Sequence, residues 1–72
     1  MSRARAAFDA AFNVQRDPRS PAYRAGCLYI LTRKLDDGPV GACPYPAGSA
    51  ENDAWYAGCD EAHAIVRRLT QR

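Results

Sequence analysis

The chain has little of several features that would point to a particular chemistry. Its 72 residues include three cysteines, one histidine and one tryptophan, and its formal net charge is only +2. An odd cysteine count does not suit a disulfide framework, and nucleic-acid-binding domains usually have a pI above about 9. No segment approaches the roughly 20 apolar residues of a membrane span, and residues 1–15 have no secretory signal pattern. We therefore expect a cytoplasmic protein with reduced thiols and no membrane segment.

Recognisable motifs for catalysis and metal binding are also missing. Segment 38–41 lacks the lysine and the following helix of a phosphate-binding loop. Three thiols and one imidazole could in principle hold zinc: Cys27, Cys43, Cys59 and His63. They contain no close cysteine pair, and free cysteines on apolar helix faces usually act as small hydrophobes. Nucleophilic catalysis by a Cys–His pair would need a third group to orient the base, and none is specified. We expect no metal, no cofactor and no catalytic residue, hence binding more than catalysis.

The residues that are present predict helices near 3–16, 20–35 and 50–69. In the first, Phe8 and Phe12 share one face, and Asp17-Pro18 ends the helix. Ser20-Pro21 is typical of a capped helix start, and Ser49 is the corresponding cap of the last helix. Segment 27–31 could be taken for a strand, but an isolated strand would have no partner. The apolar stripe of the last helix is predicted to contain Trp55, Cys59, Ala62, Val66 and Leu69.

The segment between the second and third helices is rich in proline and glycine. It covers residues 36–49, and a loop of this length in a small domain is often functional, although it can also be a flexible hinge. Within it, Pro44 and Pro46 stiffen the chain around Tyr45. The Tyr45 ring could stack on a base or anchor a protein contact, or it could fold back to cap the core. The predicted fold is therefore all-α: a small two- to three-helix domain with a long Pro/Gly-rich loop before the last helix.

Two hexapeptides of the chain resemble each other. Segment 22–27 reads Ala-Tyr-Arg-Ala-Gly-Cys, and segment 54–59 reads Ala-Trp-Tyr-Ala-Gly-Cys. Glycine inside a helix costs about 1 kcal/mol relative to alanine, so its repetition in one context favours a packing reason over chance in an alanine-rich chain. We predict a close helix crossing at Gly26 and Gly58.

Basic residues concentrate in the first third of the chain, as a solvated helix face or as a contact for a polyanion. Two further cations, Arg33 and Lys34, end the second helix just before the loop that carries Tyr45. The candidate RNA- or partner-binding residues are Arg16, Arg19, Arg24, Arg33, Lys34 and Tyr45.

Three short motifs in this order resemble the ribosome modulation factor family, also called Rmf/CrpP. They are Ala-Tyr-Arg-Ala-Gly at 22–26, Cys-Pro-Tyr at 43–45 and Trp-Tyr-Ala-Gly-Cys-Asp-Glu-Ala at 55–62. The resemblance covers about residues 20–65. It implies a single helical domain over 1–72, with residues 1–19 as an N-terminal helical extension and 20–69 as a family-like core. The family motif residues are Gly26, Cys43, Pro44, Tyr45, Trp55, Gly58 and Glu61.

The resemblance implies a ribosome-associated or RNA-binding regulator of translation, with the ribosome or ribosomal RNA as partner. The resemblance implies a short helical protein that binds the small ribosomal subunit and promotes inactive ribosome dimers. Two alternatives stay open. The chain could be a small protein-interaction or inhibitory accessory module with a protein partner. It could also resemble the branch of the family described as fluoroquinolone-phosphorylating enzymes, for which the residues offer no catalytic constellation of their own.

Overall fold

Three helices form the fold. The computed structural model describes residues 2–12 and 19–70, and in these ranges it contains α1 (Arg3–Phe12), α2 (Pro21–Leu35) and α3 (Ala50–Thr70). No strand occurs in the described ranges, so the all-α prediction is confirmed and segment 27–31 is helical. The predicted continuation of the first helix through 13–16, and its stop at Asp17-Pro18, lie outside the described residues.

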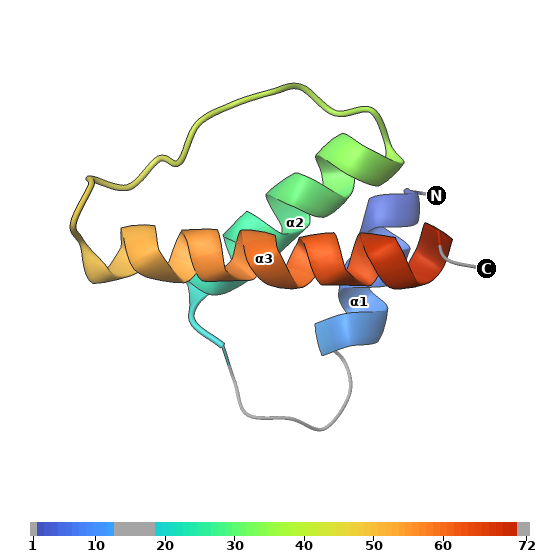
Figure 1. Ribbon diagram of the computed structural model, residues 1–72, viewed down its shortest axis with the longest axis horizontal. Helices are drawn as coiled ribbons and strands as arrows, with labels where there is room; N and C mark the ends of the chain where they lie inside the picture. Colours follow the sequence, from blue (N-terminus) through green and yellow to red (C-terminus); the bar gives the residue numbers. More distant parts are fainter. Residues whose placement is uncertain (1, 13–18, 71–72) are drawn as a thin grey trace.

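The helices α2 and α3 run in the same general direction, which explains the length of the segment between them. Figure 1 shows both helices starting on the left, with segment 36–49 returning along the top from the end of α2 to the start of α3. The 15 residues of α2 span about 22 Å at 1.5 Å per residue. Connections of a few residues join antiparallel helices instead. Segment 36–49 therefore has to be long for the fold to close.

Local signals set the ends of α2. The Ser20 hydroxyl accepts a hydrogen bond from the backbone N–H of Tyr23 at 3.2 Å, and Pro21 occupies the first helical position. At the other end the backbone N–H groups of Asp36 and Gly38 both donate to the carbonyl oxygen of Thr32 at 3.0 Å. These bonds satisfy helix-end groups that would otherwise lack partners. The predicted cap at Ser20 is thus confirmed.

A turn followed by a serine cap starts α3. The Ser49 backbone N–H donates to the Pro46 carbonyl oxygen at 3.2 Å, which closes a turn over residues 46–49. Gly48, the third residue of this turn, has a φ of 85°, as a type II turn requires. The Ser49 hydroxyl accepts from the backbone N–H of Asn52 at 3.1 Å. The predicted cap at Ser49 is confirmed as well.

The close crossing predicted from the two hexapeptides is present. A Cβ atom added to Gly26 would lie 2.8 Å from the carbonyl carbon of Trp55 and closer still to its oxygen. One added to Gly58 would lie 2.8 Å from the carbonyl carbon of Tyr23 and 3.0 Å from the backbone nitrogen of Cys27. Each glycine therefore lets the backbone of one helix touch that of the other.

The core lies where α2 and α3 pack, and α1 closes it by packing mainly on α2. Cys27 and Leu31 of α2 are fully buried, and α1 contributes Ala4 and Phe8. The stripe predicted for α3 is correct for Trp55, Cys59 and Ala62, but Ile65 completes it and Val66 is only half-buried.

The prediction for the last residue of that stripe is wrong, because Leu69 is 58% exposed. Leu69 shares a groove with residues of α1 that are all alanines, Ala7, Ala10 and Ala11. Their side chains are too short to cover a leucine, so the last turn of α3 keeps an apolar side chain at the surface. Among the described residues, no helix has both the length and the apolar character to span a membrane.

One carboxylate joins the end of α2 to the start of α1. Asp36 accepts hydrogen bonds from the Ser2 hydroxyl and from the backbone N–H groups of Arg3 (3.1 Å) and Ala4 (3.3 Å). The Ser2 hydroxyl also accepts from the backbone N–H of Arg5 at 3.0 Å, within α1. These bonds lower the pKa of Asp36 below its ordinary value, the Ser2 bond most of all. The negative charge also suits the positive end of the α1 dipole.

Candidate nucleic-acid interface

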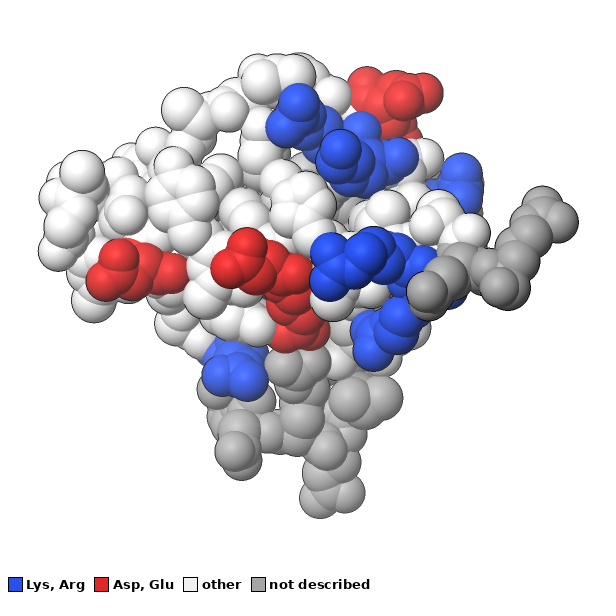
Figure 2. Space-filling view, in the orientation of Figure 1, with Lys and Arg blue, Asp and Glu red and all other residues white. Residues whose placement is uncertain are grey.

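Four cations lie in the last turns of the two principal helices: Arg33 and Lys34 of α2, and Arg67 and Arg68 of α3. All four are exposed. Figure 2 shows blue side chains over this end of the molecule with one red group beside them at the upper right, and further red groups over the first half of α3. We call these four residues the basic end.

The parallel course of α2 and α3 gives the basic end a structural cause. Two helix C-termini, each with a partial negative charge, lie at the same end of the molecule, and cations in the last turn stabilise each of them. Among the described residues, no acidic side chain forms an ion pair with any of the four. The ion pair that these residues do contain joins Arg5 and Asp9 of α1 at 3.4 Å. The charges of the basic end therefore remain available to an anionic partner.

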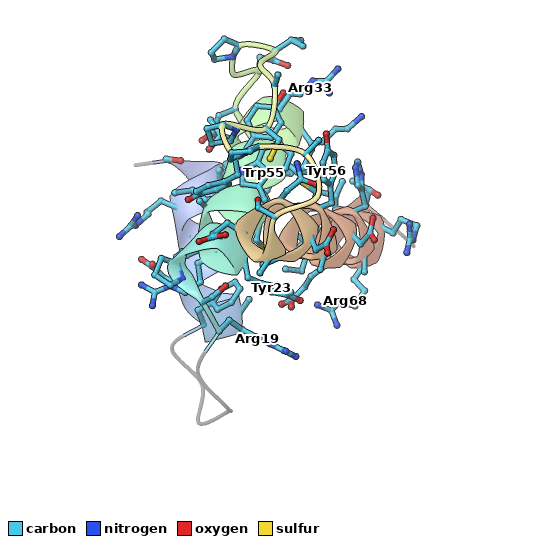
Figure 3. The ribbon with its side chains drawn as sticks, turned by 90° about the vertical axis from the view of Figure 1, so that its left-hand side faces the viewer. Arg19, Tyr23, Arg33, Trp55, Tyr56 and Arg68 are labelled. Carbon is cyan, nitrogen blue, oxygen red and sulfur yellow. The ribbon has the colours of Figure 1, made fainter. Side chains whose placement is uncertain are left out.

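The other predicted cations lie elsewhere. Arg19 and Arg24 are exposed near the start of α2. The Arg19 guanidinium lies over the ring of Tyr23, 4.9 Å from its centroid. Arg24 precedes Arg33 by about 14 Å along the axis of α2, and Arg19 lies before the start of the helix. Both therefore lie toward the opposite end of α2 from Arg33 and Lys34. Figure 3 shows Arg33 near the top of the view, with Arg19 and Arg68 near the bottom, so the basic end extends across the width of the molecule. Arg16 lies outside the described residues.

Tyr45 does not lie beside Arg33 and Lys34, as their order in the chain had suggested. Segment 36–49 carries it back to the start of α2, where it lines a groove of about 520 Å³ with Pro21 and Ala22. Its side chain is half-buried against the core, which favours the core-capping alternative for this ring.

The Cys-Pro-Tyr segment is held in place by Asn52. The Asn52 side-chain amide donates to the Cys43 sulfur and to the Tyr45 carbonyl oxygen, both at 3.4 Å. The Cys43 thiol also lies 3.9 Å from the Tyr45 carbonyl oxygen, as its donor. Asn52 was not among the predicted site residues, because its bonds join α3 to a segment seven to nine residues earlier and no local pattern indicates them.

The remaining motif residues stabilise the fold. Gly26 and Gly58 form the helix crossing, and Trp55 is 5% exposed in the core. The Tyr23 hydroxyl donates a hydrogen bond to the Glu61 carboxylate, a second link between α2 and α3. A chain can therefore keep these motif residues for packing alone.

A second hollow lies between segment 36–49 and the two helices below it. It measures about 280 Å³, and its walls include Tyr29, Arg33, Tyr56 and His63. We call it the loop hollow. The Tyr29 hydroxyl ties the segment over it, donating to the Gly41 carbonyl at 2.9 Å and accepting from the Gly41 N–H at 2.8 Å. Arg33 thus belongs both to the basic end and to this hollow.

Tyr56 is the residue of the loop hollow that the sequence analysis missed. Its side chain is 54% exposed, and its ring contacts the Trp55 ring edge-on at 5.1 Å. In the paired hexapeptides Tyr56 stands opposite Arg24, the one position where the two copies differ in chemical type. The matched glycines of the two hexapeptides account for the packing of the helices, so the unmatched position is the one that could indicate another role for Tyr56.

Two of the three cysteines lie in the core. Cys27 and Cys59 are buried, and the Cys59 thiol donates to the Gly26 carbonyl oxygen at 3.5 Å. Burial, with smaller contributions from Asp60 and Cys43, raises the pKa of Cys59 to about 11. No group of three or more potential metal ligands gathers in the described ranges.

No protein-family model, curated protein or solved structure matches this chain.

Proposed function

We propose that this protein is an RNA-binding protein that contacts its partner through the basic end, as a ribosome-associated regulator of translation. The observation that carries the proposal is the gathering of four exposed, unpaired cations at one end, Arg33, Lys34, Arg67 and Arg68. Neutralising phosphates with such cations releases counterions and is the main source of affinity in sequence-independent nucleic-acid binding.

The modest net charge does not weigh against this proposal, because the charges are separated along α3. Glu51 and Asp53 lie in the first turn of that helix, and Arg67 and Arg68 lie in its last turn. Salt screens the field of Glu51 and Asp53 at the basic end, because they lie farther from it than about 8–10 Å. Asp36 and Asp37 are exposed shortly after Lys34 and reduce the positive field there, so Arg67 and Arg68 are the cations of the basic end that lie farthest in the chain from an acidic neighbour.

The ribosome is proposed as the particular partner from the resemblance of the three motifs to the ribosome modulation factor family. Because the motif residues serve packing here, the binding experiment and not the motifs has to decide this part of the proposal.

The experiment is a salt titration with two matched double variants. Binding of a labelled ribosomal RNA fragment is followed by fluorescence anisotropy in increasing potassium chloride. We expect Arg67→Ala with Arg68→Ala to weaken binding and to reduce the slope of log K against log salt by about 0.7 per lost contact with single-stranded RNA. The control is Arg19→Ala with Arg24→Ala, which removes the same charge at the other end of the molecule.

The control pair separates the basic end from net charge. We expect it to lower the slope much less, because those cations lie outside the proposed contact. Equal effects of the two pairs would mean that binding is unspecific attraction to a cationic protein. Absence of any salt-dependent affinity for the RNA in the wild type would refute the proposal.

A protein-interaction module is the second candidate, and one observation favours it. The groove of about 520 Å³ that contains Tyr45 is lined mainly by apolar residues, among them Pro21, Ala22 and Ala54. Such a groove fits an apolar side chain of a protein partner. Tyr45→Ala would abolish that contact and leave the salt titration unchanged, so the two candidates give different results.

A further inference from the structure

The loop hollow combines an exposed aromatic ring with a cation at one mouth. Tyr56 projects from the first half of α3, and Arg33 projects from the last turn of α2. Figure 3 shows both side chains on the same side of the molecule, beside the returning segment. The Tyr56 side chain is 54% exposed and is not part of the core. An exposed ring and a cation therefore line the same hollow.

The hollow suits one flat ring better than a bulky ligand. Its volume of about 280 Å³ lies just below the roughly 300–1,000 Å³ of pockets for drug-sized ligands. Unpaired RNA bases are commonly bound by stacking on aromatic side chains, with a nearby cation on the backbone. Arg33 connects the two surfaces, because it lines the hollow and also belongs to the basic end that is proposed to hold phosphates.

We propose that the loop hollow binds a single unpaired nucleobase of the RNA, stacked on Tyr56, while Arg33 holds an adjacent phosphate. This inference rests on the proposed function and deepens it, because it adds a base contact to the phosphate contacts. It also assigns the stacking role to Tyr56 and not to Tyr45, whose ring is half-buried at the other end of α2.

The polar groups of the hollow are compatible with a base. Asp60 and His63 lie on its α3 wall. A carboxylate would repel a phosphate, but it accepts hydrogen bonds from the exocyclic amino groups of cytosine and adenine. Asp60 therefore disfavours a free anion in the hollow and favours a base that carries an amino group. His63 and Arg33 can donate to acceptor atoms of the base or to its phosphate.

The test uses two probes of equal length: a short oligoadenylate and an abasic ribose-phosphate oligomer, which keeps the phosphates and lacks the bases. The wild type is expected to bind the oligoadenylate about 5- to 150-fold more tightly, the range for one stacked base. Tyr56→Ala should remove this difference without changing affinity for the abasic oligomer. Tyr56→Phe should restore it, because phenylalanine retains the aromatic face.

The fluorescence of the single tryptophan, Trp55, can report on binding at the loop hollow. Trp55 lies edge-on to Tyr56 at 5.1 Å, so a base in the hollow should change its fluorescence. We expect the oligoadenylate to change Trp55 emission in the wild type and in Tyr56→Phe, and the abasic oligomer to leave it unchanged. Circular dichroism of each variant verifies that the helices are intact.

The outcomes separate this inference from the function on which it rests. If neither probe binds with salt dependence, the proposed function itself is wrong. If both bind equally well and Tyr56→Ala changes neither, RNA binding stands and the base site is refuted. If Tyr45→Ala removes the preference for the oligoadenylate and Tyr56→Ala does not, the stacking ring is Tyr45 and the assignment to the loop hollow is overturned.

Discussion

Replacing Gly58 with alanine adds one methyl group at the point where α2 and α3 touch. The added carbon would lie 2.8 Å from the carbonyl carbon of Tyr23, closer than the 3.0 Å below which real Cβ atoms essentially never come. Its nearest neighbours are backbone atoms of Tyr23 and Cys27, so no side-chain rotation can relieve the overlap. The two helices have to separate, and the packing beside the crossing has to loosen with them.

Two opposing effects set the magnitude. Alanine gains about 1 kcal/mol over glycine in a helix interior, while overpacking a tight site costs about 1–3 kcal/mol and occasionally more. Because backbone and not side chain resists the methyl group, we expect the cost to lie at the upper end of this range, which leaves a net destabilisation of about 2 kcal/mol. In a domain of this size each kcal/mol lowers the Tm by about 4–8 °C. Gly26→Ala should behave alike, since its Cβ would meet the Trp55 backbone.

Urea unfolding followed by helical circular dichroism and by Trp55 fluorescence measures the effect. Gly41→Ala is the matched control, because its added carbon would lie 3.7 Å from the Tyr29 ring, an ordinary contact. We expect the control to change stability by less than about 0.5 kcal/mol. The double variant Gly26→Ala with Gly58→Ala should be less destabilised than the sum of its parts, because one separation relieves both overlaps. A Gly58→Ala protein as stable as the wild type would refute the close crossing.

Three further predictions concern single contacts. The lowered pKa of Asp36 means that its charged form stabilises the native state. This stabilisation is complete above the ordinary pKa of 3.8 and is lost as the pH falls through the lowered pKa. The urea midpoints of Asp36→Asn and wild type should therefore converge in acid, and a difference that does not change with pH would contradict this. Tyr23→Phe should cost about 1 kcal/mol in thermal melts through loss of the bond to Glu61, and an unchanged Tm would contradict this. With a thiol pKa of about 11, Cys59 should alkylate more slowly than the half-buried Cys43 in the native protein, and mass mapping of Cys59 as the first site would show the burial to be wrong.

The sequence was most informative where a contact is local or repeated. Ser20 and Ser49 are recognisable caps because the amide each one accepts from lies three residues ahead. Gly26 and Gly58 were predictable over a long range only because the same hexapeptide surrounds both. In both cases the physical cause of the structure could be read from a short window.

Contacts between distant, unremarkable residues could not be predicted in the same way. Asp36 looks like an ordinary helix stop, and its bonds to Ser2 join positions 34 apart. Tyr45 was misplaced because neighbourhood along the chain suggested neighbourhood in space. The parallel course of α2 and α3 sends segment 36–49 back along the molecule, and the direction of a helix pair is a property of the packed core.

The structure also changes what the three motifs can imply about function. A glycine at the crossing, a tyrosine–glutamate link and a buried tryptophan would be required by any protein with this packing, whatever it binds. None of these is among the residues that would meet an RNA, which are Arg33, Lys34, Tyr56, Arg67 and Arg68. Two chains can therefore share the motifs and the fold while differing at the surface that selects a partner. For this reason the decisive variants lie at the basic end and in the loop hollow, and a motif variant that loses binding would report first on stability.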